Sequence, residues 1–220
     1  MSRLGRPRLH LREIDSTNRR ARELAAAGAP HGTLVTAGAQ TAGRGRQGRT
    51  WEAPEGAALL CSLVVRKLDP LLSLRAGLAV ADVAGAAARV KWPNDVLLDG
   101  GKVAGVLVEG RPGEGWAVVG IGVNVAAAPE GVGAVALGRP DVEAVLAELL
   151  AALELRLGEP PADTLRALRE RDALLGAELR WEGGSGVGDG IGDDGGLRVK
   201  LPGGGATVLS AGEVHLGSRA

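Results

Sequence analysis

The continuous apolar run at residues 57–66, AALLCSLVVR, constrains the fold more than any other feature of this sequence. A run of this length that contains β-branched residues is typical of a buried strand. The long, Ala-rich segment at 73–89 then predicts a helix packed against a sheet. Three further strand candidates follow, at residues 89–98, 102–110 and 116–125. Because Asp99-Gly100-Gly101 is a hairpin turn signal between the first two, this part of the chain predicts a substantial sheet.

Capping residues and periodicity predict the helices. A first helix begins after Asp15 or Ser16, either of which can cap it, and ends at Gly28. Another begins at the cap Asp141 and keeps Val and Leu on one face until Gly158 stops it. The remaining segments that favour regular structure are a strand at 31–38 and a helix at 163–176.

The character of the sequence changes after Gly176, where short strand-like segments alternate with glycine-rich turns. Such a unit is too small to hold a large core alone, so we expect it to dock on the preceding domain. The sequence therefore predicts an α+β protein, with a mixed β-sheet and packed helices at 1–175 and a small β-barrel domain at 176–220. Residues 183–196 are expected to form a long loop that ends in a hairpin turn at Asp194-Gly195.

The balance of charge argues against several classes of protein. Lys and Arg number 26, and Asp and Glu also number 26, so the chain lacks the net positive charge of a typical nucleic-acid-binding protein. No apolar run approaches the roughly 20 residues that cross a bilayer, and the N-terminal stretch lacks the apolar core of a signal peptide. The single cysteine, Cys61, excludes an internal disulfide framework. We therefore expect a cytoplasmic protein without nucleic-acid or membrane partners.

Residues 40–51, QTAGRGRQGRTW, raise the question of function. Their glycines have the G-x-G-x-x-G spacing of a dinucleotide-binding turn, but that turn must open a helix and a strand follows here. A nucleic-acid contact lacks the support of a basic stripe or an aromatic platform, and a solvated charged loop is the plainest alternative. The remaining interpretation is a mobile loop whose Arg44, Arg46 and Arg49 fold over a small polyanion, because guanidinium groups match phosphate oxygens in pairs.

A second segment, 91–110, interrupts strand-forming residues with polar ones. Pro93 has no amide hydrogen, so it breaks a ladder or marks an edge. The plainer interpretation of Asn94 and Asp95 is a β-bulge with local side-chain bonds, and the functional one is a strand end that presents an amide and a carboxylate to a pocket. Lys102 stands out in a chain that nearly always uses Arg, and an ammonium fits between two anions where a guanidinium fork does not.

The scarce amide residues fall in the same segments. Gly120 and Gly122 interrupt an apolar strand and suggest the close approach of another group. The asparagines and glutamines of the chain are Asn18, Gln40, Gln47, Asn94 and Asn124. Their concentration beside the Arg loop and Lys102 predicts a site for a nucleotide and a small polar ligand.

Other candidate sites are weaker. His10, His31 and His215 lack the spacing of metal ligands, so we expect no zinc site. Cys61 lies in the apolar run and is expected to pack in the core. Trp51 is either a core residue or a ring on which adenine stacks.

The motifs DSTN, QTAGRGRQGRTW, KWPNDVLLDGGKVAGVLVE and GIGVNV, in this order, resemble those of the biotin protein ligases, also called biotin–[acetyl-CoA-carboxylase] ligases. The resemblance covers nearly the whole chain. It implies a sheet domain like that of class II aminoacyl-tRNA synthetases, followed by a small Src-homology-3-like barrel. It also implies that ATP, with Mg²⁺, activates biotin as biotinyl-5′-AMP, and that the biotinyl group passes to a lysine of a biotin carboxyl carrier protein. A homodimer joined at the sheet edges is compatible with it.

The resemblance assigns roles to particular residues. The expected catalytic set is Lys102, between the biotin carboxylate and the α-phosphate, with Arg46 on the phosphates and Asp95 to orient the acceptor amine. The residues that match biotin-binding positions are Ser16, Thr17, Asn18, Gln40, Gly43, Arg44, Lys102, Gly105 and Gly122. Those that match ATP-binding positions are Arg46, Arg49, Trp51, Asn94, Asp95 and Asn124. Glu213 matches an acidic barrel residue that faces the nucleotide, and no metal ligand is assigned.

The sequence also departs from some relatives. Fifteen residues precede Ser16, so we expect no N-terminal DNA-binding domain, and the segment EGVGAVALG lacks the aromatic residue that some relatives place over adenine. Two other functions stay open. One is a lipoate– or octanoate–protein ligase of related fold, against which the KWPND segment argues. The other is a non-enzymatic protein, either a biotin-responsive regulator or a nucleic-acid-binding module.

Overall fold

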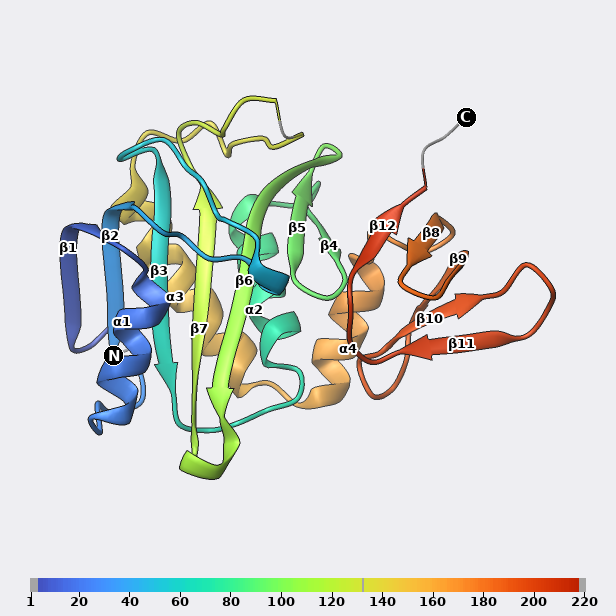
Figure 1. The fold of residues 1–220 in the computed structure, drawn as a ribbon, viewed down its shortest axis with the longest axis horizontal. Coiled ribbons are helices and arrows are strands. Elements are labelled where there is room, and N and C mark those ends of the chain that lie inside the picture. Colours follow the sequence, from blue (N-terminus) through green and yellow to red (C-terminus); the bar gives the residue numbers. More distant parts are fainter. Residues whose placement is uncertain (1–3, 132, 218–220) are drawn as a thin grey trace.

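The larger of two sheets has seven strands in the order β1-β2-β3-β7-β6-β5-β4 in the computed structural model, which describes residues 4–131 and 133–217 (Figure 1). These strands are β1 (Arg8–Ile14), β2 (Leu34–Gln40), β3 (Ala58–Val65), β4 (Arg89–Lys91), β5 (Asp95–Leu98), β6 (Gly101–Arg111) and β7 (Trp116–Asn124). β1 and β2 are parallel, and the other neighbouring strands are antiparallel. The sheet is therefore mixed, as the sequence predicts.

The helices in the described part of the chain are α1 (Thr17–Ala26), α2 (Leu72–Ala84), α3 (Val142–Gly158) and α4 (Pro161–Glu170), with short 3₁₀ turns at η1 (Arg46–Gly48) and η2 (Pro112–Glu114). Two of them, α1 and α3, begin at the caps that the sequence predicts. Ser16 caps α1, and the Asp141 carboxylate accepts a 2.9 Å bond from the Ala144 amide at the start of α3. None of these helices has the length and apolar character needed to cross a membrane.

Helices lie on both faces of the larger sheet. α2 and α3 pack against one face, where β3 contributes Leu59, Cys61 and Leu63 to the main core. α1 packs against the other face, over Val64 and Val118. Because α1 covers only one end of its face, the rest of that face is crossed by the loop that contains η1 (Figure 1).

The strand register shows which residues lie on this partly covered face. Paired residues on neighbouring strands point to the same side of a sheet, so rows of side chains run across β3, β7 and β6. The two rows next to α1 are the Ser62 row (Ser62, Gly120 and Leu107) and the Gly122 row (Leu60, Gly122 and Gly105). Asp95 of β5 pairs with Gly105 and extends the Gly122 row.

The second sheet is antiparallel, with the strand order β11-β10-β9-β8-β12. Its strands are β8 (Glu178–Trp181), β9 (Gly184–Ile191), β10 (Leu197–Lys200), β11 (Ala206–Leu209) and β12 (Val214–Leu216). Its buried Leu197 and Val199 belong to the same core as α2 and α3. In addition, Trp92 Nε1 donates a 3.0 Å hydrogen bond to the Gly195 carbonyl. The second sheet is therefore packed on the larger one.

Several elements differ from the sequence-based prediction. The strand at 8–14 was not predicted, although Leu9 and Leu11 alternate with polar residues as in a half-buried strand, and in the structure it forms the edge β1. The segment 89–98 is not one strand but the hairpin β4–β5, which turns at Trp92-Pro93-Asn94. The helix expected at 73–89 ends at Ala84, because Gly85 has a φ of 99°.

The prediction of a long loop at 183–196 is wrong over most of its length. Residues 184–191 form β9 between β8 and β10. Its glycines hid this strand, but they also permit it, because a methyl group at Gly186 would overlap the Lys200 carbonyl. The hairpin turn that was predicted at its end is confirmed, since Asp194 accepts a 2.9 Å bond from the Gly196 amide between β9 and β10.

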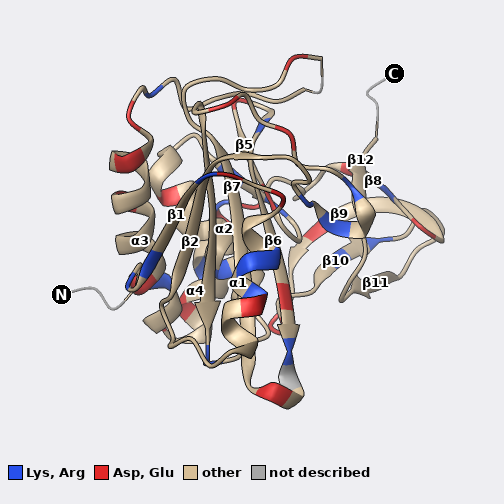
Figure 2. Ribbon diagram, turned by 60° about the vertical axis from the view of Figure 1, so that its left-hand side comes forward, with Lys and Arg blue, Asp and Glu red and all other residues tan. Residues whose placement is uncertain are grey.

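Acidic and basic residues are interspersed over the helices and strands (Figure 2). Many form surface ion pairs, such as Arg8–Glu143 and Arg139–Glu148, each with a closest distance of 2.6 Å. Exposed pairs of this kind contribute little to stability, so they are not functional candidates.

Candidate active site

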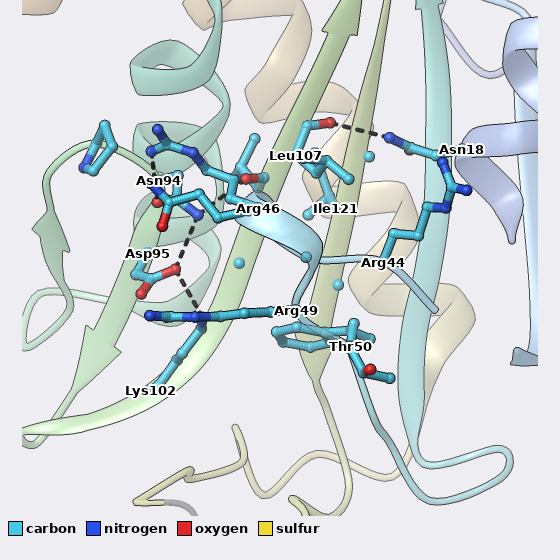
Figure 3. A pocket seen from close by; sticks show the side chains of 18 of the residues that line it. Asn18, Arg44, Arg46, Arg49, Thr50, Asn94, Asp95, Lys102, Leu107 and Ile121 are labelled. Carbon is cyan, nitrogen blue, oxygen red and sulfur yellow. Dashed lines mark hydrogen bonds and ion pairs between the residues drawn. The ribbon is translucent and has the colours of Figure 1, made fainter. Parts of the chain in front are cut away.

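A cavity lies under the η1 loop, on the part of the larger sheet that α1 leaves uncovered (Figure 3). The empty space within it, open mouth included, is about 880 Å³. The predicted residues in its lining are Ser16, Thr17, Asn18, Gln40, Arg44, Arg46, Arg49, Trp51, Asn94, Asp95, Lys102, Gly105, Gly122 and Glu213. The structure thus brings together residues from distant parts of the chain, and only Gly43 and Asn124 of the predicted set lie outside the lining.

Trp51 lies across the Gly122 row. A methyl group at Gly122 would overlap its indole, and one at Gly105 would lie 3.1 Å from the indole Cζ3 atom. These glycines therefore make room for a flat group on the sheet, as the sequence suggests, and in this structure the group is Trp51. Its Nε1 is buried with no hydrogen-bond partner among the described residues. Lys102 Nζ lies 5.6 Å from the ring centre, a distance that suits a cation–π contact.

A chain of polar contacts joins Lys102 to the loop (Figure 3). Lys102 Nζ lies 2.8 Å from Asp95 Oδ1, and Asn94 Nδ2 donates a 3.1 Å bond to the same oxygen. The Asn94 Oδ1 atom accepts a 3.1 Å bond from Arg46. The Asp95 side chain is 15% exposed and that of Lys102 is 37% exposed. The ammonium is therefore accessible to a ligand while its carboxylate partner is mostly covered.

The second sheet supplies partners for the loop. Arg46 Nη2 donates a 3.1 Å bond to the Gly212 carbonyl, and Arg49 forms an ion pair with Glu213. Both partners lie directly before β12. The sequence predicts a loop that is mobile until a polyanion binds, whereas in this structure protein oxygens already contact its guanidinium groups.

Gly43 and Asn124 support the site from outside the cavity lining. Gly43 accepts a 3.0 Å bond from the Trp51 amide, and a methyl group there would overlap the Trp51 carbonyl. Asn124 Nδ2 donates to the carbonyls of Lys102 at 3.4 Å and Val135 at 3.1 Å. Asn124 therefore holds the backbone that carries Lys102.

Buried polar side chains surround the start of α1. Thr17 and Asn18 are each 4% exposed, and Ser62 is fully buried. The Gln40 Oε1 atom accepts a 2.7 Å bond from the Thr17 amide. Asn18 lies over Gly120, where a methyl group would overlap the Asn18 amide. The close approach that the sequence suggests at Gly120 is therefore made by Asn18.

Cys61 also borders the cavity, but its chemistry excludes a nucleophilic role. Its side chain belongs to the main core, and burial raises the pKa of the thiol to about 12, against a smaller opposite effect of Arg8. The group is therefore a neutral thiol at physiological pH, in agreement with the predicted core position.

Sequence reasoning missed Ser62 and Glu109. Ser62 is a single hydroxyl-bearing residue in an apolar run. Only the register of β3 and β7 shows that it lies beside α1. Glu109 lies at the end of β6, where a charged residue is ordinary, but its carboxylate accepts a 2.9 Å bond from Asn18 Nδ2. Because 91 positions separate these two residues, no local pattern connects them.

In the part of the chain that the structure describes, no group of three or more His, Cys, Asp or Glu side chains is placed to hold a metal ion. The charged groups that line the cavity are the Lys102–Asp95 pair, the arginines of the loop, Lys91 and Glu213. A cavity with these groups defines a class of protein that binds an anionic small molecule on an open mixed sheet.

The chain belongs to the biotin/lipoate A/B protein ligase family, whose sequence model matches residues 11–125. It is 38% identical to the biotin–[acetyl-CoA-carboxylase] ligase of Mycobacterium tuberculosis, over 93% of this chain and 87% of that protein. It is also 38% identical to the ligase of the same name from Paracoccus denitrificans, over 94% of this chain and 99% of the relative. The resemblance noted in the motifs is thereby confirmed.

The fold is similar to that of a biotin protein ligase from Aquifex aeolicus solved in complex with biotin and ATP. The TM-score is 0.81 at 29% sequence identity, and the match covers 96% of this chain and 98% of that one. The predicted α+β class, with a mixed sheet and packed helices, is therefore confirmed.

Proposed function

We propose that this protein is a biotin–protein ligase, which activates biotin with ATP and transfers it to a lysine of a biotin carboxyl carrier protein. The observation on which this rests most is the Lys102–Asp95 pair on the cavity wall, with the arginines of the η1 loop beside it. Relatives that carry this activity in their names match this chain over nearly its whole length. The solved relative with biotin and ATP bound supports the same pair of ligands here.

In the first step, a carboxylate oxygen of biotin attacks the α-phosphorus of ATP. A new oxygen–phosphorus bond forms, the bond to pyrophosphate breaks, and the products are biotinyl-5′-AMP and pyrophosphate. The two reacting groups are both anions and repel each other. The Lys102 ammonium is accessible at the cavity wall, so it stabilises both when it lies between them. Arg46 and Arg49 supply further positive charge for the phosphates.

The two ligands divide the cavity between them in this proposal. The biotin ring lies near α1, with Ser16, Thr17, Asn18, Gln40, Arg44, Gly105 and Gly122 around it, and Gly43 supports it through the Trp51 backbone. The nucleotide lies toward the β4–β5 hairpin, with Arg46, Arg49, Trp51, Asn94, Asp95 and Asn124 around it. Trp51 now occupies the Gly122 row, so the indole must shift as ligands enter. Asn124 acts through the Lys102 backbone, since it lies outside the lining.

In the second step, the amine of the carrier lysine attacks the acyl carbon of the adenylate. A carbon–nitrogen bond forms, the carbon–oxygen bond to AMP breaks, and the proton that the amine loses passes to solvent. Asp95 is the nearest carboxylate to Lys102, and it accepts a hydrogen bond from an ammonium already. We assign it the role of orienting the incoming amine.

Magnesium enters the proposal with ATP. Mg²⁺ in such sites is held mainly by phosphates and water, with one or two carboxylates from the protein. Asp95 and Glu213 both line the cavity and offer such oxygens. Because the cavity offers few carboxylates, we propose that the Mg²⁺ ion arrives bound to the nucleotide. There it neutralises phosphate charge.

We also propose that the chain is organised in two domains. We assign residues 1–175 to the catalytic domain and 176–220 to the C-terminal domain. The five antiparallel strands after Gly176 support a Src-homology-3-like barrel for the latter, whose Glu213 faces the nucleotide. We assign the protein to the cytoplasm and expect a homodimer to form through the edges of the larger sheet.

The test is incubation of the purified protein with biotin, ATP–Mg²⁺ and a biotin carrier domain, with detection of biotin on the carrier by mass spectrometry. We expect one biotinyl group on the carrier lysine, and release of pyrophosphate that depends on biotin. Parallel reactions with lipoate and octanoate separate the related ligase activity. Modification of a lipoyl domain without modification of the biotin carrier would overturn the proposal.

A further inference from the structure

The Gly122 row continues to the edge of the larger sheet and ends at Lys91. Asp95 of β5 pairs with Lys91 of β4, and β4 is the last strand in the sheet order. Because paired residues share a face of the sheet, Lys91 follows Asp95 on the side of the cavity, and it belongs to the cavity lining. The order along the row is therefore Leu60, Gly122, Gly105, Asp95 and Lys91.

Lys91 is the one cation of this lining that has no partner in the described part of the chain. Its side chain is half-buried and makes no hydrogen bond or ion pair with a described residue. The other cations of the lining are matched: Lys102 with Asp95, Arg46 with Asn94, Arg49 with Glu213, and Arg44 with Glu109 at 3.9 Å. Since charges that leave bulk water are normally paired, the Lys91 ammonium is available to an anionic ligand.

The backbone of Lys91 is fixed on the cavity wall. On one side β4 pairs with β5. On the other side the Val90 amide donates a 2.8 Å bond to the Arg171 carbonyl, and the Val90 carbonyl accepts a 3.0 Å bond from the Ala173 amide. The Lys91 carbonyl accepts a 3.2 Å bond from the Asn94 amide across the turn. Only the flexible four-carbon side chain is therefore left to adjust to a ligand.

The direction of the first step points toward this end of the row. In phosphoryl transfer the attacking oxygen, the phosphorus and the leaving oxygen lie roughly in line. In the proposed complex the biotin ring lies near α1 and Gly122, and Lys102 lies over Gly105, where a methyl group would come within 3.5 Å of Nζ. The biotin carboxylate thus reaches the α-phosphorus from the Gly122 side. The bond to pyrophosphate then points the opposite way, toward Asp95 and Lys91.

We propose that Lys91 is a further catalytic residue of the first step, which binds the pyrophosphate leaving group. Negative charge grows on pyrophosphate as its bond to the α-phosphorus breaks, and an ammonium group beside it stabilises that charge. Lys102 serves the attacking side of the phosphorus, and Lys91 serves the leaving side. This inference rests on the proposed function and adds a leaving-group site to it. The plainer alternative is a solvated lysine at a sheet edge.

The reverse of the first step separates these two roles. An oxygen of pyrophosphate attacks the α-phosphorus of biotinyl-5′-AMP, an oxygen–phosphorus bond forms, and the bond to the biotin carboxylate breaks. The products are ATP and biotin. Because biotin and AMP enter already joined, the dependence of the rate on pyrophosphate concentration reports on the leaving-group site.

Lys91→Met removes the ammonium and keeps an apolar side chain of similar length. We expect it to raise the KM for pyrophosphate in ATP synthesis from biotinyl-5′-AMP about 10- to 100-fold, the effect of losing one charge-assisted hydrogen bond. Single-turnover formation of biotinyl-5′-AMP should slow as well. The KM for biotin and the transfer from prepared adenylate to the carrier should stay unchanged. Lys91→Arg keeps a cation that binds phosphate oxygens, so its KM for pyrophosphate should lie much closer to that of the wild type.

Lys67→Met is the matched control, because it removes an exposed lysine beyond the end of β3 and makes the same change in net charge. It should leave every step intact. If Lys91→Met does not fold, Lys91→Gln removes the same charge and is measured in the same way.

An unchanged KM for pyrophosphate in the neutral Lys91 variant would overturn the inference and leave the proposed function intact. A loss confined to transfer onto the carrier would overturn it too, because Lys91 would then face the carrier. A wild-type protein that releases no pyrophosphate in the presence of biotin and ATP would instead reject the proposed function, and this inference with it.

Discussion

Each functional side chain in this site is held in place by a neighbouring residue that no local sequence pattern identifies. The Lys102 ammonium is held by Asp95, and Asn18 fits only because Gly120 has no side chain. The sequence could indicate these residue types, since lysines and amides are rare in this chain. It could not indicate Ser62 or Glu109, because their roles follow from strand register and from contacts between distant residues.

At Lys102 we expect Lys102→Ala to slow adenylate formation about 100- to 1000-fold, the usual effect of removing one electrostatic stabiliser from an active site. Single-turnover formation of biotinyl-5′-AMP is the measurement. Transfer from chemically prepared adenylate to the carrier should change far less. Lys200→Ala removes a lysine that also contacts an aspartate, Asp189, at 2.6 Å on the surface, and should leave both steps intact. Equal losses in both steps would contradict this role.

At Gly122 we expect a single methyl group to weaken the binding of both ligands. Gly122→Ala places a Cβ atom in the space that the Trp51 indole now fills and that the biotin ring takes in the proposed complex, and such overpacking of the bound ligand costs about 1–3 kcal/mol. Calorimetric titration should therefore give dissociation constants raised about 5- to 150-fold. Gly113→Ala is the control, because a Cβ there meets open space. Wild-type affinities in Gly122→Ala would mean that no ligand group packs against Gly122.

Among the elements, the apolar strands and capped helices were the most predictable. Residues 57–66 contain β3, and Asp141 and Gly158 mark the ends of α3. Elements without such signals were missed: β1 is a polar edge strand, and β9 is rich in glycine. Their strand conformation is set by pairing with neighbours, which a local pattern does not contain.

Removal of the α3 cap, which lies far from the cavity, should lower the stability of the protein without changing the activity of the site. Asp141→Ala removes the acceptor of the Ala144 amide and should lower the free energy of unfolding by about 1 kcal/mol. Thermal unfolding should show a lower Tm by about 2–4 °C for a chain of this size, with unchanged biotin kinetics. Asp141→Asn preserves a capping side chain and should restore most of the stability. A Tm equal to that of the wild type in Asp141→Ala would rule out the cap.

The η1 loop should act as a clamp on the adenylate. Arg46→Gly removes the bonds to Asn94 and to the Gly212 carbonyl, and charge-assisted bonds of this kind contribute about 1.5–3 kcal/mol. We expect biotinyl-5′-AMP to dissociate at least about tenfold faster and to label unrelated proteins. Dissociation of radiolabelled adenylate is the measurement, and Arg111→Gly, at an exposed turn pair with Glu114, is the control. A wild-type dissociation rate in Arg46→Gly would refute the clamp.

For the molecule as a whole, the two sheets share one core although they form separate hydrogen-bonded ladders. Leu197 and Val199 of the second sheet belong to the core of α2 and α3, and Arg46 and Arg49 reach across to residues before β12. The change of character after Gly176 predicted where the second sheet begins. It could not predict this shared core, because amino-acid composition does not specify which elements contact each other.

The shared core leads us to expect a single unfolding transition. Leu197→Ala removes a fully buried side chain of the second sheet and should lower the free energy of unfolding of the entire chain by about 2–5 kcal/mol. Urea unfolding followed by circular dichroism and by loss of biotin binding should give coincident curves. Leu201→Ala, at a residue that is 37% exposed, should be nearly neutral. Two separated transitions would show that the sheets unfold independently.

Trp51 gives this protein an optical reporter of its own. Its indole N–H is buried and makes no hydrogen bond among the described residues, while Trp92 and Trp116 donate theirs to Gly195 and Glu114. A ligand that enters the Gly122 row must change the surroundings of this one indole. Ultraviolet excitation of the unlabelled protein should therefore reveal occupancy as a shift in emission wavelength, and a Trp51→Leu protein should be blind to it.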